Sequence, residues 1–162
     1  MSDTAEEIVA KHWSKMAKVR QGYYSWTESP FVMRHVNRLI SGDPEVGWLE
    51  YACRKYLLNG AKGAERGLSI GCGTGALERG VRRMDACAVI DACDIAPGAI
   101  EKAKALASRE GVNGIHYRLG NLEKESLPEN DYDVVFASMA VHHFENLEHL
   151  YAEIKKLSLI HI

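Results

Sequence analysis

The chain has 162 residues, of which 46% are hydrophobic and 26% charged, a balance typical of one globular domain. A net charge of -2 is too small to indicate nucleic acid or an anionic membrane surface as a partner. No apolar run approaches the roughly 18 residues of a membrane span, and the acidic first residues do not resemble a secretory signal.

The cysteines indicate a reducing environment. Cys53, Cys72, Cys87 and Cys93 form neither a CxxC pair nor the spacing of zinc ligands. Isolated cysteines of this kind are usually buried thiols, and disulfides are rare in the cytosol. We therefore expect a cytoplasmic protein with no metal site, and the sequence leaves its oligomeric state open.

The first part of the chain, residues 1–65, predicts a helical N-terminal extension. Thr4 and Glu7 form a capping box ahead of an amphipathic run that ends near residue 20. Pro30 opens a second predicted helix, which runs to residue 40. A third helix is expected to start at Asp43-Pro44, with an apolar face that continues to residue 57.

From residue 66 to residue 156, short apolar runs alternate with helical patterns. The runs at 68–70, 87–93, 115–119 and 133–137 predict strands, and the segments 75–84, 97–110 and 146–156 predict helices. The run at 133–137 is apolar enough for burial on both faces. This alternation predicts an α/β fold with a doubly wound parallel sheet, as in Rossmann-like proteins.

The sharpest motif is the glycine-rich segment Leu68–Gly75, which reads LSIGCGTG. Glycines between a strand and a helix let a ligand approach bare backbone, and the helix N-terminus favours a negative group. Gly71, Gly73 and Ala76 also satisfy the degenerate dinucleotide fingerprint. The motif alone is therefore compatible with an NAD-dependent oxidoreductase as well as with other nucleoside-binding domains.

Two aspartates near the end of the second predicted strand compete for a role in ribose binding. A carboxylate about 20 residues after the glycine turn can accept hydrogen bonds from ribose hydroxyls. Strand alternation places Asp91 and Asp94 on opposite faces, and Asp94 lies nearer the strand end. We therefore expect Asp94 to contact the ribose.

Further segments follow the glycine turn in a characteristic order. They are Gly71–Gly75 with Leu77-Glu78, Asp94–Pro97 with Ile100 and Ala103, Gly120–Leu122 with Leu127-Pro128, Tyr132–Phe136, and His142–Phe144. Over residues 65–156 this series resembles the class I S-adenosylmethionine-dependent methyltransferases, which have a Rossmann-like fold. The resemblance implies S-adenosyl-L-methionine as cofactor and methyl transfer to an acceptor, which we expect to be a small molecule.

The resemblance also implies a set of cofactor-binding residues. They are Gly71, Cys72, Gly73, Gly75, Asp94, Ile95, Asn121, Leu122 and Ala137. The family often has an acidic residue where Ser69 stands, so part of the usual polar support for the cofactor is expected to be missing. It often has Asp where Asn121 stands, although an amide oxygen can still accept a bond from the adenine amino group.

Two groups of residues are candidates for binding or activating the acceptor. His142 and His143 follow the fourth predicted strand, at the sheet edge where open α/β folds bind ligands. One of them could act as a general base, or both could brace the last helix. Tyr24 and Trp26 could line the acceptor or form a lid, or could simply pack on the sheet.

Two alternatives remain open at this stage. An NAD-dependent oxidoreductase shares the glycine turn and Asp94, but it does not explain the segment at Asn121-Leu122 or the histidine pair. A non-catalytic nucleoside-binding module would use the same pocket without transferring a group. Methyl transfer accounts for more of the motifs than either alternative.

The end of the chain departs from the resemblance after Lys156. A family member continues there into a fifth strand, usually through a Pro-Gly-Gly turn, and then into two more strands. Here the chain reads LSLIHI over residues 157–162, the translation of CTGTCTCTTATACACATC, a transposon end used in sequencing libraries. We therefore expect residues 157–162 to be a non-native tail, and the fold to lack its last strands.

This truncation predicts that the strand at 133–137 lacks its outer neighbour. An apolar strand at the edge of a sheet offers unpaired backbone groups to other chains. The fragment is then expected to aggregate readily and to show little turnover, even if it retains affinity for the cofactor.

Overall fold

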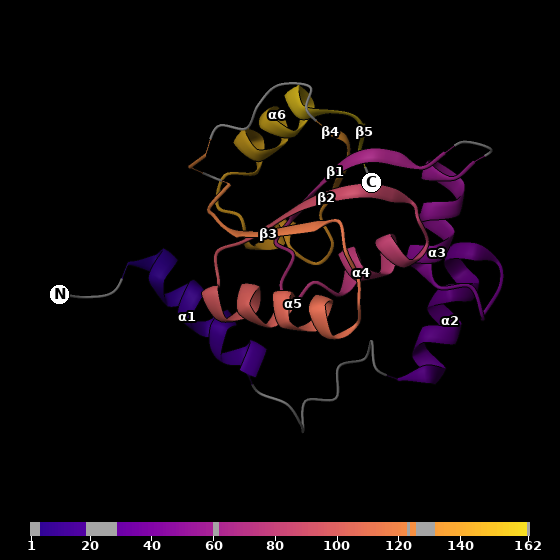
Figure 1. Ribbon diagram of the computed structural model, residues 1–162, viewed down its shortest axis with the longest axis horizontal. Helices are drawn as coiled ribbons and strands as arrows, with labels where there is room; N and C mark the ends of the chain where they lie inside the picture. The colour runs from indigo at the N-terminus through magenta and orange to yellow at the C-terminus, as the bar shows by residue number, and fades with distance from the viewer. Residues whose placement is uncertain (1–3, 19–28, 60–61, 123, 126–131, 162) are drawn as a thin grey trace.

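The computed structural model describes residues 4–18, 29–59, 62–122, 124–125 and 132–161, drawn in colour in Figure 1. Tyr24, Trp26 and Leu127-Pro128 lie outside these described residues. The sheet has five parallel strands in the order β3-β2-β1-β4-β5. The strands are β1 (Ala64–Ile70), β2 (Cys87–Asp94), β3 (Ile115–Leu119), β4 (Tyr132–Phe136) and β5 (Ser158–His161).

Helices cover both faces of the sheet, as a doubly wound fold requires. Helix α6 (Leu147–Leu157) lies on one face, and α4 (Ala76–Arg83) and α5 (Pro97–Arg109) lie on the other (Figure 1). A strand that is covered on both faces therefore contributes side chains to two hydrophobic cores, one on each face of the sheet. Val134 and Phe136 of β4 pack in the core on the α4 and α5 side, whereas Val135 packs with Leu150 and other residues of α6. The expected α/β Rossmann-like fold is confirmed.

The first helix, α1 (Ala5–Lys18), begins with the expected capping box. The Thr4 backbone N–H donates to the Glu7 carboxylate at 2.8 Å, and the Glu7 N–H donates to the Thr4 hydroxyl at 3.3 Å. These two bonds satisfy donors that the first helical turn leaves free. Helix α1 packs beside α5 (Figure 1). Among the described residues, no helix is both long and apolar enough to cross a bilayer.

The third helix starts later than the sequence suggested. Helix α2 (Pro30–Ser41) ends at Gly42, whose φ of 85° is left-handed. The Asp43 carboxylate then accepts the Glu45 backbone N–H at 2.8 Å and holds residues 43–46 in a turn. Helix α3 therefore begins at Trp48 rather than at Asp43-Pro44, and after α3 (Trp48–Ala52) the chain continues as the π-helix η2 (Cys53–Leu57).

The expectation that β4 would be an exposed edge strand is wrong for this structure. After α6 the backbone of Ser158–His161 pairs in parallel with β4, with Tyr132 opposite Ser158 and Val134 opposite Ile160. An extended segment that leaves a covering helix can satisfy the free N–H and C=O groups of β4, whatever its origin. The prediction that residues 157–162 are not native to the protein is a separate one, which this pairing does not test.

The turn between β1 and α4 needs glycine for two separate reasons. Gly75 has a φ of 75°, which side chains disfavour, and it is the N-cap of α4. A Cβ atom at Gly75 would also collide with the phenol ring of Tyr117. Gly111 has a similar φ of 65°, but a Cβ atom there would meet nothing within 4 Å.

This difference predicts unequal costs for two alanine substitutions. Gly111→Ala should lower the free energy of unfolding by about 1–2 kcal/mol, the cost of a left-handed alanine. Gly75→Ala should cost a further ~1–3 kcal/mol, because the buried Tyr117 must move. Urea denaturation of both variants measures the two values, and equal losses would contradict the collision at Gly75.

Candidate functional site

The glycine turn lies at the carboxyl end of β1 and is held in an unusual backbone conformation. Gly71 and Gly73 have φ values of 64° and 52°. The Cys72 N–H donates to the Cys93 carbonyl at 3.0 Å, which ties the turn to the end of β2. Burial raises the pKa of the Cys72 thiol, and the carboxylates of Glu78 and Asp94 raise it further. Cys72 is therefore a neutral thiol rather than a nucleophile.

Asp94, at the end of β2, faces this turn. Its carboxylate accepts the Gly73 backbone N–H and the Ala96 backbone N–H, each at 2.8 Å. Asp91 belongs instead to a polar network with Arg66, His116 and Tyr132, at 2.7, 3.0 and 3.2 Å. The structure therefore separates the two aspartates as the strand alternation predicted, and Asp94 is the one beside the glycine turn.

A pocket of about 700 Å³ opens over the glycine turn at the carboxyl edge of the sheet. This is the edge at which open α/β sheets bind their ligands. The pocket brings together Gly71, Cys72, Gly73, Asp94, Ile95, Asn121, Leu122, His142 and His143 from the residues that the sequence singled out. It does not include Gly75, which contacts Tyr117 beneath the turn, or Ala137, which lines a second pocket. We call this first cavity the glycine-turn pocket.

Helix α1 forms a wall of the glycine-turn pocket that the sequence analysis missed. Val9 and Trp13 line the pocket, and Glu6 pairs with Lys124 on the segment that carries Asn121. The Ser14 hydroxyl accepts the Gly98 backbone N–H at 3.2 Å, which fixes α1 on the start of α5. The apolar face of α1 was visible in the sequence, but its packing partner was not.

The two histidines stand on η3 (Val141–His143), a short 3-10 helix that follows β4. Their rings are 3.9 Å apart between centroids, and the Trp13 ring meets the His143 ring edge-on at 5.1 Å. Burial lowers the pKa of His143 below its ordinary 6.5, and the neighbouring His142 lowers it further. Both histidines line the same pocket as Asp94. The lowered pKa favours the neutral form of His143 at pH 7.

A buried carboxyl lies beneath the glycine turn. Glu78, in the first turn of α4, is completely buried and accepts a hydrogen bond from the Ser69 hydroxyl on β1. Burial raises the pKa of Glu78, more than the hydrogen bond from Ser69 lowers it. Its second oxygen, Oε2, has no hydrogen-bond partner among the described residues. Glu78 thus places a carboxyl group beside Ser69, but neither residue lines the glycine-turn pocket.

The residues in the pocket suit S-adenosylmethionine. Gly71 and Gly73 bring bare backbone to the cavity wall, and Asp94 offers a carboxylate to ribose hydroxyls. The side-chain oxygen of Asn121 can accept a bond from an adenine amino group. The volume lies within the range of pockets that enclose ligands of this size.

A parallel sheet of this order, with a glycine turn and a carboxylate at the end of its second strand, defines a Rossmann-like nucleoside-binding domain. A family model described as "Methyltransferase domain" matches residues 68–158. The chain belongs to this methyltransferase domain family.

Similar proteins agree with this assignment. The aklanonic acid methyltransferase DauC of Streptomyces sp. (strain C5) is 35% identical over 78 residues, which is 48% of this chain and 36% of DauC. The uncharacterized methyltransferase C1B3.06c of Schizosaccharomyces pombe is 27% identical over 113 residues, which is 65% of this chain and 40% of that protein. The chain thus spans 36% and 40% of the length of these two curated relatives.

The fold is also found in solved structures. The crystal structure of a SAM-dependent methyltransferase from Aquifex aeolicus matches with a TM-score of 0.59. The match covers 80% of this chain and 67% of that one, at 17% sequence identity. At this identity the likeness supports the fold alone.

The buried carboxyl makes stability depend on pH in a direction that can be tested. Because its folded pKa is raised, Glu78 favours the folded state below its unfolded pKa near 4.5, and this contribution is lost as pH rises through the folded pKa. Glu78→Gln keeps a neutral partner for Ser69. We expect the stability of the wild type relative to Glu78→Gln to fall between pH 4 and pH 7, measured by urea denaturation.

Glu110→Gln is the matched control with the opposite sign. Burial raises the pKa of Glu110, but the charges and hydrogen bonds of Arg79 and Arg83 outweigh this effect and lower it overall. Ionised Glu110 therefore stabilises the folded state above its unfolded pKa, and this stabilisation is lost as pH falls through its folded pKa. If both variants changed with pH in the same direction, Glu78 would not be the buried neutral acid described above.

Proposed function

We propose that the protein transfers the methyl group of S-adenosylmethionine to a small-molecule acceptor. The observation that carries this proposal is the convergence of the glycine turn, Asp94 and the histidine pair in one pocket. The relative DauC, named for a single organic acid, supports a small acceptor. A net charge of -2 offers no attraction for a nucleic acid acceptor.

In this proposal the glycine turn and the end of β2 hold the cofactor. The Asp94 carboxylate binds the ribose hydroxyls, and Asn121 and Leu122 contact the adenine. When bound, S-adenosylmethionine supplies a methyl group whose bond to sulfur breaks with the electron pair going to sulfur, while the acceptor atom gains the methyl and loses its proton. The protein's own contribution is mainly to align the acceptor and to exclude water.

His143 is the better candidate for the base that takes the acceptor's proton. Its pKa is lowered by burial and by His142, so its imidazole is neutral and able to accept a proton at pH 7. Both histidines line the same pocket as Asp94. His142 adds to the effect of burial on the pKa of His143, because two adjacent imidazolium ions would repel each other.

The family match weighs against the NAD-dependent oxidoreductase, which shares only the glycine turn and the carboxylate. A nucleoside-binding module without catalysis remains the competing proposal. It predicts cofactor binding without methyl transfer.

Cofactor choice and the role of Asp94 can be tested together by titration calorimetry on the 162-residue chain. S-adenosylhomocysteine, the demethylated product, should bind, and NAD should bind far more weakly. Asp94→Ala should weaken binding of S-adenosylhomocysteine by roughly 1.5–3 kcal/mol, the range for hydrogen bonds to a charged group.

Asp91→Ala is the matched control, because Asp91 lies on the same strand but bonds away from the pocket. It should leave the affinity for S-adenosylhomocysteine unchanged. Unchanged affinity in Asp94→Ala would overturn the ribose assignment, and preferential binding of NAD would overturn the proposed reaction.

The protonation state of His143 tests the proposed base directly. In a two-dimensional NMR titration of the histidine ring protons, His143 should titrate below the ordinary value of 6.5. His142→Gln should raise that midpoint, because the neighbouring His142 contributes to the lowering of the His143 pKa. A His143 ring that is still protonated at pH 7 would exclude it as the base.

A further inference from the structure

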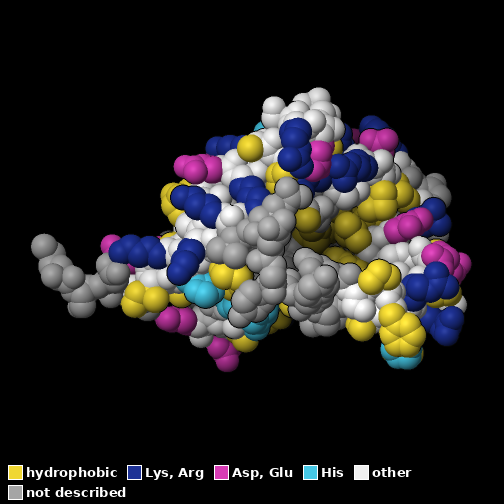
Figure 2. Space-filling model, turned by 90° about the horizontal axis from the view of Figure 1, so that it is seen from below, with side chains coloured by type: hydrophobic (Ala, Val, Ile, Leu, Met, Phe, Trp, Pro, Cys, Tyr) yellow, Lys and Arg dark blue, Asp and Glu magenta, His cyan; other side chains and the backbone are white. Residues whose placement is uncertain are grey.

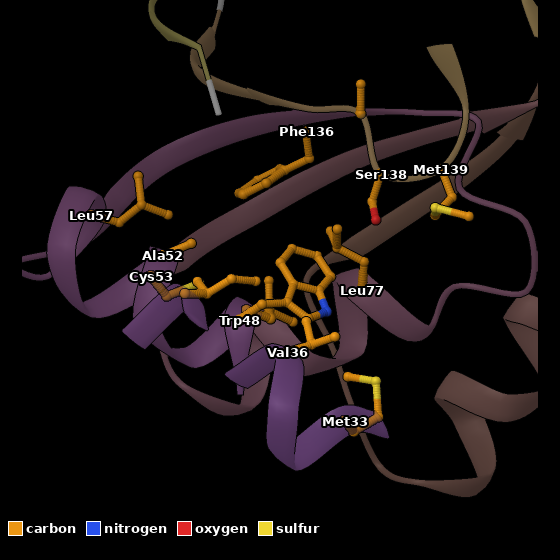
Figure 3. A pocket seen from close by; sticks show the side chains of 13 residues that line it. Met33, Val36, Trp48, Ala52, Cys53, Leu57, Leu77, Phe136, Ser138 and Met139 are labelled. Atoms are coloured by element: carbon orange, nitrogen blue, oxygen red, sulfur yellow. The ribbon is translucent and has the colours of Figure 1, made fainter. Parts of the chain in front are cut away.

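A second cavity lies beside the glycine-turn pocket and has a different chemistry. It has a volume of about 560 Å³ and is enclosed by α2, α3, η2, the start of α4 and the chain that follows β4. Figure 3 shows the Trp48 indole in the middle of the lining residues, with Phe136 on the sheet side and Met33 on the side of α2. We call this cavity the apolar pocket.

The walls of the apolar pocket suit an uncharged ring system. None of the described residues that line it is charged, and Ser138 is the lining residue with an aliphatic hydroxyl. Met33 and Met139 add flexible thioether side chains, which adapt to irregular apolar shapes. Trp48 is 37% exposed, so a large aromatic surface stays in contact with solvent until something covers it.

The two pockets share a wall. Ser138 and Met139 line both the apolar pocket and the glycine-turn pocket. Met139 is 70% exposed and has a φ of 56°, a left-handed conformation that side chains rarely adopt. Backbone strain of this kind persists where the surrounding structure requires it, and it is frequent at ligand sites. The two cavities are therefore neighbours, and Ser138 and Met139 form the boundary between them.

The apolar pocket also draws on a different part of the chain. The family match begins at residue 68, whereas Met33, Val36 and Trp48 precede it. In Figure 2, hydrophobic side chains gather beside a hollow on the half of the molecule that carries α2 and α3. The shared domain thus supplies most of the glycine-turn pocket, with α1 as one wall, and α2 and α3 supply one side of the second cavity.

We propose that the apolar pocket holds the uncharged fused-ring skeleton of the methyl acceptor, with the acceptor's hydroxyl directed past Ser138 and Met139 toward the glycine-turn pocket. This proposal rests on the proposed function. The volume of about 560 Å³ fits a fused-ring molecule. A charged acceptor would lose its hydration without gaining a partner, because the lining offers no opposite charge.

The probe for this site is β-naphthol, a neutral fused-ring phenol. Calorimetry measures its binding to the 162-residue chain saturated with S-adenosylhomocysteine. We expect binding to the wild type, and at least about tenfold weaker binding to Val36→Asp, which places a charge on the pocket wall. Ala52→Phe fills the cavity without adding charge and should weaken binding similarly.

Leu39→Asp is the matched control, because Leu39 lies on the same helix but is 73% exposed and does not line the pocket. It should leave β-naphthol affinity unchanged. All variants should keep the wild-type affinity for S-adenosylhomocysteine, which separates this proposal from the proposed function. Only variants that still melt cooperatively are compared with the wild type. Val36→Asp and Ala52→Phe change the pocket in different ways, so either one can test the proposal if the other does not fold.

Three results would overturn the proposal. One is a chain that binds S-adenosylhomocysteine but not β-naphthol. Another is equal β-naphthol affinity in Val36→Asp, Ala52→Phe and the wild type. The third is a wild-type dimer in sedimentation that Val36→Asp dissociates, because the apolar pocket would then be the contact between two copies. Loss of S-adenosylhomocysteine binding in the wild type would instead remove the proposed function.

Discussion

The hydrogen bond between Ser69 and the buried Glu78 is the contact on which the glycine turn depends. It joins the end of β1 to the first turn of α4 from below, directly under the three left-handed glycines. A carboxyl that loses all contact with water is costly unless it is neutral and bonded, and burial does raise the pKa of Glu78. The turn thus rests on a polar pair that is sensitive to any change of partner.

The first turn of α4 also connects the glycine turn to α5. Arg79 donates to the Thr74 carbonyl and to the Glu110 carboxylate, both at 2.7 Å, so the loop is tied to the far end of α5. With the loop held, the Gly73 N–H meets the Asp94 carboxylate without further rearrangement. A ribose would therefore find the carboxylate already in place, which lowers the entropy cost of binding.

Much of this arrangement follows from the sequence, because parallel strands and glycine turns leave strong patterns. The strand at Ile115–Leu119 follows from its sequence pattern. The choice of Asp94 over Asp91 follows from strand alternation together with the position of Asp94 near the strand end. Three features did not follow. The pattern shows that α1 has an apolar face but not that Trp13 meets His143. The sequence does not show that the carboxyl of Glu78 is buried. Four residues after α6 are too few to predict the pairing of β5.

The two pockets are built from different parts of the chain. The glycine-turn pocket is built mainly from the matched domain, with α1 as an added wall. One side of the apolar pocket comes from Met33, Val36 and Trp48, which precede the match. A change in those residues alters the shape of the second cavity but does not touch Asp94 or the glycine turn. Under the proposed function, acceptor choice could thus diverge while cofactor binding is retained, because function lies in sites carried by a shared fold.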